Sequence, residues 1–227
     1  MTQPLTIAID GPAASGKSTL GQMLAHHFGY LYFDTGILYR AVTHLALKRS
    51  MDLADTEALV DLAARTAFTV LPPTIADGRQ YTVIADGEDI TWALRSAQVE
   101  RNVSQISSYP RIREVLREQQ RSIGRAGRVV MAGRDIGAVI MPDADLKIYL
   151  DASVEERALR RTAELQQQGR AVDYADVLGD LTRRDARDAQ NTFRAQDAVA
   201  LRTDGRTPEQ LLHDILALTG AHVQAGE

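Results

Sequence analysis

The apolar residues of this chain follow two patterns, short continuous runs and longer stretches with helical spacing. Runs rich in apolar residues at 5–9, 30–33, 129–132, 146–150 and 198–202 predict strands, the first of them buried. Between them, apolar residues recur three or four positions apart, as Leu20, Leu24 and Phe28 do. Strands that alternate with helices predict an α/β fold with a parallel sheet flanked by helices, and a ligand site at the carboxyl ends of the strands.

Helix start and stop signals place the predicted helices along the chain. The first follows a glycine-rich turn and ends before Gly29, and Asp55 is the expected N-cap of the third. Pro110 suits the first position of a helix. The remaining helices are expected at 37–48, 55–65, 96–107, 110–125, 153–168, 174–189 and 208–218, followed by a frayed tail at 221–227.

One region departs from the α/β alternation. Runs at 68–71 and 81–85, separated by Pro72-Pro73 and Asp77-Gly78, predict two short antiparallel strands. We therefore expect one domain over residues 1–227 that carries a small antiparallel β insertion.

The turn between the first strand and the first helix carries the clearest chemical signal. Residues 11–18 match the phosphate-binding P-loop pattern G-x-x-x-x-G-K-[ST] without a mismatch. Such a loop directs backbone N–H groups and a helix N-terminus at a polyphosphate, with Lys17 on the β- and γ-phosphates and the Ser18 hydroxyl on Mg²⁺. The predicted ATP-binding residues are Gly11, Pro12, Ala13, Ala14, Ser15, Gly16, Lys17, Ser18 and Thr19.

Composition narrows the class of protein. The formal net charge is −4 with no basic run, which disfavours a nucleic-acid polymer as partner. The chain contains no cysteine, no basic leader and no apolar run long enough to cross a membrane, so we expect a soluble, cytoplasmic monomer. Lysine occurs only at positions 17, 48 and 147, and the other basic residues are arginines, which bind phosphate oxygens in a bidentate manner.

Three further clusters lie just after predicted strands or on helices expected to border the site. They are Asp34-Thr-Gly-Ile-Leu-Tyr-Arg40, Gly133-Arg134-Asp135, and the segment 183–188 with Arg184 and Asp188. Arginines beyond those that ATP requires indicate an acceptor that is itself anionic. A phosphate group on the acceptor fits this pattern.

These residues carry a family resemblance. The chain resembles the bacterial cytidylate (CMP) kinases over about residues 7–216. The shared motifs occur in the same order, and they lie at 12–19, 34–40, 87–91, 95–99, 103–106, 110–114, 133–137 and 142–144.

The resemblance implies transfer of the γ-phosphate of ATP to CMP or dCMP. Lys17, Arg134 and Arg184 are then the expected catalytic residues, and Mg²⁺ accompanies ATP. It also implies that residues 67–107 form the nucleoside-monophosphate-binding insertion and that 168–195 form a helical lid. The expected CMP-binding residues are Thr35, Tyr39, Arg40, Ser104, Arg113, Arg134, Asp135, Arg184 and Asp188.

Base chemistry assigns two of these residues a discriminating role. Cytosine presents an N4 amino donor beside the N3 and O2 acceptors, so Asp135 opposite N4 and Arg113 opposite N3 and O2 would suit cytosine. Uracil has a carbonyl where cytosine has the amino group, so Asp135 and Arg113 in these positions would disfavour the binding of uracil.

Two positions depart from the family pattern. Ala132 stands where the family usually has an acidic residue, so Asp10 would have to help with the metal, or Ser18 and the phosphates alone would hold it. Asn191 stands where a further arginine is expected, in a lid that is about four residues short, and Arg194 or Arg187 could replace it.

Some of the motifs also occur in proteins of other function. Asp34 after the second strand could bind an acceptor hydroxyl, as in kinases of the shikimate kinase kind, and a pyrimidine kinase of broader base range would also phosphorylate UMP. A GTPase switch is disfavoured, because it requires an Asn-Lys-x-Asp motif and the chain has no Asn-Lys pair.

Overall fold

The computed structural model describes residues 5–219, except for the side chain of Asn191. Five strands are hydrogen-bonded in the order β2-β6-β1-β7-β8, and a separate three-stranded sheet has the order β3-β4-β5. The chain divides into two compact units, one formed by the segments before Gly29 and from Val130 onward, the other by Gly29–Val129. Among the described residues, no helix is long and apolar enough to cross a membrane.

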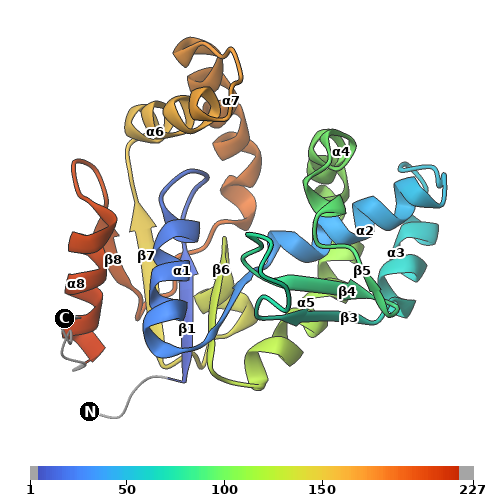
Figure 1. The fold of residues 1–227 in the computed structure, drawn as a ribbon, viewed down its shortest axis with the longest axis horizontal. Helices are drawn as coiled ribbons and strands as arrows, with labels where there is room; N and C mark the ends of the chain where they lie inside the picture. The colour runs from blue at the N-terminus through green and yellow to red at the C-terminus, as the bar shows by residue number, and fades with distance from the viewer. Residues whose placement is uncertain (1–4, 220–227) are drawn as a thin grey trace. The chain divides into compact units, whose positions relative to one another are not determined.

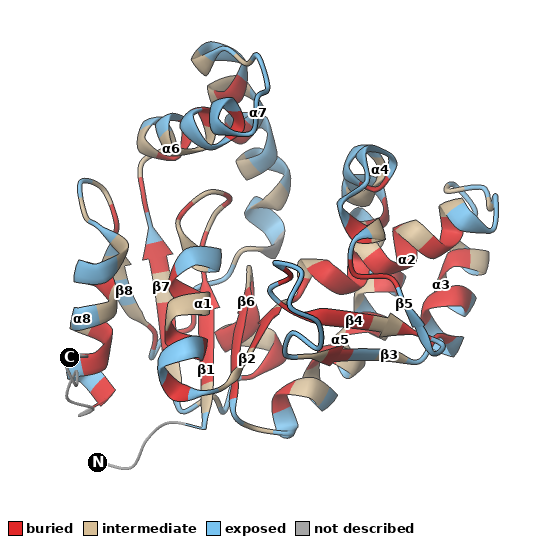
Figure 2. Ribbon diagram, viewed as in Figure 1, coloured by how far each residue is buried: buried red, intermediate tan, exposed pale blue. Residues whose placement is uncertain are grey.

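The first unit is built around parallel strands. These are β1 (Thr6–Asp10), β6 (Val129–Gly133), β7 (Leu146–Asp151) and β8 (Val199–Arg202). β1 pairs in parallel with β7, with Ile7 opposite Leu146, and β7 pairs in parallel with β8. Most residues of β1 and β6 are buried, as Figure 2 shows, because such strands are covered on both faces.

Helices of the first unit flank these strands and extend beyond their carboxyl ends. α1 (Lys17–Phe28) packs against β1 and against α8 (Pro208–Thr219). α6 (Val154–Gln167) and α7 (Tyr174–Asp188) form an antiparallel hairpin beyond the end of β7 (Figure 1). A π-helical turn, Ile136–Ile140, follows β6, and a short 3-10 turn, Ala189–Asn191, follows α7.

The second unit combines β2 (Leu31–Asp34) with four helices and the antiparallel sheet. α2 (Gly36–Lys48) packs against α4 (Ala97–Ser108), and α3 (Thr56–Arg65) against α5 (Pro110–Arg125). The Asp55 side chain caps α3 by accepting a hydrogen bond from the backbone N–H of Ala58, as its sequence position predicts.

The antiparallel sheet consists of β3 (Phe68–Leu71), β4 (Thr82–Ala85) and β5 (Glu88–Asp89), followed by a 3-10 turn, Ala93–Arg95. The sequence pattern predicted the first two strands but not β5. Asp86 and Gly87 both have positive φ (49° and 85°) and form the two-residue turn that folds β5 back onto β4. The predicted tail at 221–227 lies outside the described residues.

Candidate active site

The P-loop lies between β1 and α1 in a conformation that depends on its glycines. Gly11 has φ +148°, and a Cβ atom there would lie 2.3 Å from the Leu150 carbonyl oxygen of β7. Gly16 has φ +95°, and Ala14 also adopts a positive φ of 58°. The loop therefore crosses close to the end of β7, and a side chain at position 11 would push it away.

Two cationic side chains turn onto the carbonyl oxygens at the start of the loop. The Lys17 ammonium donates to the carbonyl oxygens of Gly11 (2.8 Å) and Pro12 (2.6 Å). The Arg134 guanidinium donates to the same Gly11 oxygen at 2.7 Å. These contacts bring the predicted catalytic residues Lys17 and Arg134 to one point of the P-loop, where a polyphosphate would find positive charge.

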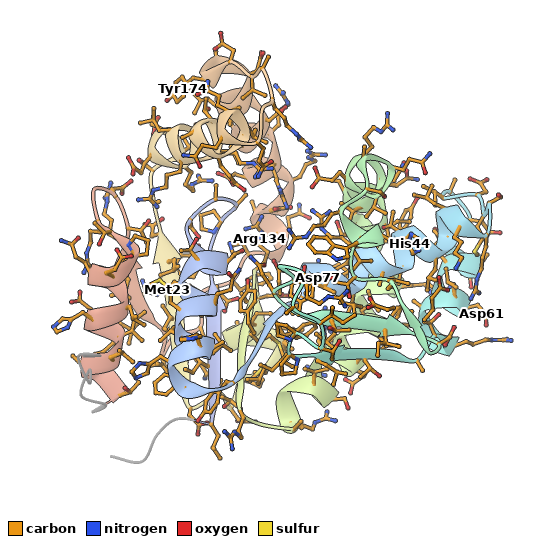
Figure 3. The ribbon with its side chains drawn as sticks, viewed as in Figure 1. Met23, His44, Asp61, Asp77, Arg134 and Tyr174 are labelled. Atoms are coloured by element: carbon orange, nitrogen blue, oxygen red, sulfur yellow. The ribbon has the colours of Figure 1, made fainter. Side chains whose placement is uncertain are left out.

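Arg134 also joins the P-loop to α7. Its guanidinium donates to the Asp188 carboxylate from Nε (3.2 Å) and from Nη2 (2.8 Å), while Arg184 Nε lies 3.7 Å from the same oxygen. Figure 3 shows Arg134 near the end of β6, close to the lower end of α7. Three residues predicted from two separate sequence motifs, Arg134 from one and Arg184 and Asp188 from the other, thus form one cluster beside the loop.

Two carboxyl groups of the first unit, those of Asp10 and Asp135, lie near each other. Asp10, at the end of β1, is 3% exposed and accepts hydrogen bonds from the backbone N–H groups of Ile136 (2.7 Å) and Gly137 (2.8 Å). Burial, together with the nearby negative charge of Asp135, raises the pKa of Asp10 from 3.8 to about 6, although the two backbone hydrogen bonds and Lys17 act in the opposite direction. Asp10 thereby fixes the turn that follows the predicted base-reading residue Asp135.

The other predicted acceptor residues belong to the second unit. Arg113 of α5 places its guanidinium 5.8 Å from the centre of the Tyr39 ring, so these two residues are brought together. Arg40 donates to the Leu94 carbonyl (3.3 Å) and to Glu100 of α4 (3.2 Å). Thr35 is buried before α2, and Ser104 is exposed on α4.

Tyr81, on which the charge of Arg40 acts, was not anticipated from the sequence. Tyr81, directly before β4, is nearly buried, and its hydroxyl forms a hydrogen bond with Arg95. Burial is the main reason why the pKa of Tyr81 is raised, and the charges of Asp34 and Arg40 also act on it. The motif that contains Arg95 was noted in the sequence, but no spacing rule links it to a tyrosine 14 positions earlier.

Arg157 of α6 was also missed. Its guanidinium is buried and donates to the Ala13 carbonyl of the P-loop (3.1 Å), and it forms a two-point ion pair with Asp185 of α7. In the sequence it is one of three arginines in a strongly charged helix, and such residues are mostly exposed. Nothing in the sequence distinguishes it from the other two.

No cluster of three or more His, Asp or Glu side chains suited to a metal occurs among the described residues. The Ser18 hydroxyl is exposed in the first turn of α1, immediately after Lys17. A hard oxygen donor at the rim of a phosphate-binding loop fits Mg²⁺, which usually takes most of its ligands from phosphates and water.

The fold and the P-loop define a protein of the P-loop class. Two solved structures share the fold: a gluconokinase from Sinorhizobium meliloti, with a TM-score of 0.50 and 13% identity over 97% of this chain and 94% of that chain, and an uncharacterised protein from Eubacterium ventriosum, with a TM-score of 0.51 and 11% identity over 96% and 99%. At such identities the likeness concerns the fold alone.

Sequence comparison then gives the family. The cytidylate kinase family model matches residues 7–220. The chain is 67% identical to the cytidylate kinase of Herpetosiphon aurantiacus, covering 99% of this chain and 98% of that protein, and 52% identical to the cytidylate kinase of Chloroflexus aggregans, covering 92% and 91%. The chain therefore belongs to the cytidylate kinase family, and the resemblance seen in its motifs is confirmed.

Proposed function

We propose that this chain transfers the γ-phosphate of ATP to CMP or dCMP, giving ADP and CDP or dCDP. The observation that carries the proposal is the family match over residues 7–220. In the same chain, Lys17 and Arg134 contact P-loop carbonyl oxygens, and Arg184 lies 3.7 Å from the Asp188 carboxylate to which Arg134 donates. Phosphoryl transfer depends mainly on alignment and on neutralising the charge of the transferring group, and these cations supply that charge.

Lys17 would change partners when ATP binds. Its ammonium, which contacts the Gly11 and Pro12 carbonyl oxygens in this structure, would turn to the β- and γ-phosphate oxygens. The backbone N–H groups of the loop and the N-terminus of α1 would hold the rest of the polyphosphate. The CMP phosphate is largely dianionic at neutral pH and needs no general base.

A magnesium ion that accompanies ATP would supply neutralisation of the phosphate charge. Ser18 is the protein ligand that we propose. Both carboxylate oxygens of Asp10 accept backbone hydrogen bonds, so we assign Asp10 to holding the turn after β6.

For the acceptor, we propose the residues that the shared family motifs supply. Thr35, Arg40 and Arg134 would bind its phosphate, Ser104, Arg113 and Asp135 its base, and Arg184 and Asp188 its sugar and the transferring group, with Tyr39 beside Arg113. A buried carboxylate such as Asp135 would accept from cytosine N4 and oppose the uracil carbonyl. Left mismatched, a buried polar pair of this kind can cost up to about 10⁴-fold in efficiency.

Two segments complete the proposal. Residues 67–107, which contain the antiparallel sheet and α4, would be the nucleoside-monophosphate-binding insertion, and residues 168–195, which contain α7, the lid of a single kinase domain. A monomeric state and a cytoplasmic location stay predictions from the sequence, to be tested by light scattering and cell fractionation.

The decisive experiment measures ADP release from Mg·ATP with CMP, dCMP, UMP, AMP or shikimate as the sole acceptor. We expect strong turnover with CMP and dCMP and little with UMP. Comparable turnover with UMP would still show a nucleoside-monophosphate kinase, but it would refute the assignment of Arg113 and Asp135 to base discrimination. Turnover with shikimate alone, or with none of the acceptors, would refute the proposed reaction.

A variant then tests the base contact. Asp135→Ala should lower kcat/KM for CMP far more than it weakens ATP binding, because the carboxylate is assigned to the base. Asp143→Ala provides a matched control, since Asp143 is an exposed carboxylate shortly after the same turn. Equal losses for CMP and UMP would show that Asp135 does not discriminate between the bases.

A further inference from the structure

Two arginines connect the P-loop to α7 in the same manner. Each donates to one P-loop carbonyl and to one α7 carboxylate: Arg134 joins Gly11 to Asp188, and Arg157 joins Ala13 to Asp185. The two carboxylates are three positions apart, so they lie on one face of the helix about one turn apart. The end of α7 is therefore tied to the loop at two successive points.

The two connections differ in burial. The side chain of Arg157 is 5% exposed, whereas that of Arg134 is 17% exposed. Arg157 also donates from Nε to the Ala152 carbonyl (3.1 Å), and its Nη1 and Nη2 lie 3.2 Å and 2.6 Å from the two Asp185 oxygens. A guanidinium whose edges all face protein acceptors is held in place and offers little surface to a ligand.

Apolar packing supports the same connection. Ala13 of the P-loop belongs to a buried cluster with Ala158 and Leu165 of α6 and Val177 and Leu181 of α7. The tip of the loop therefore packs into the core of the α6–α7 hairpin. Arg157 and Asp185 form the polar side of a contact whose other side is hydrophobic.

We propose that Arg157 and Asp185 are a positioning pair that sets the rotation of α7, so that Arg184 and Asp188 point to the P-loop. Arg184 directly precedes Asp185 and lies 3.7 Å from Asp188, so a turn of the helix that freed Asp185 would also carry Arg184 away. The inference rests on the proposed function, because it assigns Arg184 to the transferring phosphate. Arg157 itself does not touch a substrate.

Arg157→Lys tests the pair in the full-length chain. Lysine keeps the charge but cannot make the two-point contact with Asp185 together with the contacts to Ala13 and Ala152. A displacement of about 1 Å in a catalytic group can cost about 10²-fold, so we expect kcat with CMP to fall about 10²-fold while KM for CMP changes less than about threefold. Arg183→Lys is the matched control, because Arg183 is an exposed arginine of α7 that pairs with Asp180, and its kcat should stay within about twofold of the parent value.

A double-mutant cycle distinguishes a loss of orientation from a general loss of stability. Asp185→Asn should reproduce the loss in kcat, and the double variant should lose little more than either single variant, because both remove the same orientation. Additive losses, or a loss confined to KM, would overturn the proposal. Thermal unfolding of each variant establishes whether the chain remains folded at the assay temperature.

Hydrogen exchange separates this inference from the proposed reaction. With an ATP analogue and no acceptor, backbone amides of residues 180–188 should exchange faster in Arg157→Lys than in the parent or in Arg183→Lys. If the parent fails to phosphorylate CMP but this difference is seen, the reaction is refuted and the positioning pair stands. Equal exchange in all three proteins would overturn the pair.

Discussion

Asp10 gives a prediction about stability that can be worked out from the structure. Its pKa is raised to about 6 from 3.8 because the carboxyl is buried, so the folded chain binds this proton more tightly than the unfolded chain does. Unfolding then releases a proton between about pH 4 and pH 6. The contribution of Asp10 to the free energy of unfolding is therefore highest below this window and declines as pH rises through it.

The magnitude follows from the two pKa values. Their difference corresponds to about 3 kcal/mol, at about 1.4 kcal/mol per pH unit, and about 2 kcal/mol of it falls between pH 4.5 and pH 7.5. Asp10→Asn removes the titrating proton while keeping the shape of the side chain. The stability of the parent relative to this variant should therefore decline by about 2 kcal/mol between these two pH values.

Urea unfolding at pH 4.5, 5.5, 6.5 and 7.5 measures the free energy of unfolding of the parent and of each variant. Asp61→Asn is the control, because Asp61 is an exposed carboxylate of α3, and its difference from the parent should hardly depend on pH. If the free energy of unfolding depends on pH in the same way for the parent and for Asp10→Asn, the reasoning is refuted. It is also refuted if the parent becomes more stable relative to the variant as pH rises.

The remaining predictions concern the P-loop and the lid. Lys17→Ala should lower kcat at least about 10²-fold while circular dichroism stays unchanged, and full activity would contradict the assignment. Gly11→Ala should destabilise the chain by about 1–3 kcal/mol and more than Gly16→Ala, because only at position 11 would the new methyl meet a backbone atom, and thermal unfolding compares them. Hydrogen exchange over 166–194 should slow when an ATP analogue and CMP are added together, and unchanged exchange would argue against a lid.

Most of the fold was predictable because its strands are strongly apolar and its helices are clearly bounded. The predicted α5, bounded by Pro110 and Arg125, has the same limits in the structure, and β3 matches residue for residue. β5 could not be found from hydrophobicity, since Glu88 and Asp89 are both exposed and pair only because the Asp86-Gly87 turn brings them back to β4. That dipeptide was the signal to use.

The site was predictable to the extent that its residues lie in motifs. The P-loop, Arg134, Arg184 and Asp188 were named from sequence, and the structure brings Arg134 into contact with Gly11 and Asp188. Arg157 could not be named, because its role arises from three segments that meet only in the folded chain. The same holds for the link from Asp10 to the π-helical turn, which depends on the neighbouring positions of β1 and β6.

The carboxylate of Asp188 has a consequence for how tightly the site can hold an anion. With Arg134 at 2.8 Å and Arg184 at 3.7 Å, it acts as a counter-ion within the protein, and it offsets the mutual repulsion of cations gathered at one place. A phosphate that recruits these arginines must compete with this resident anion. The free energy of binding is then the difference between two sets of ion pairs, so the phosphate is held less tightly than the arginines alone would hold it, which favours release of the product.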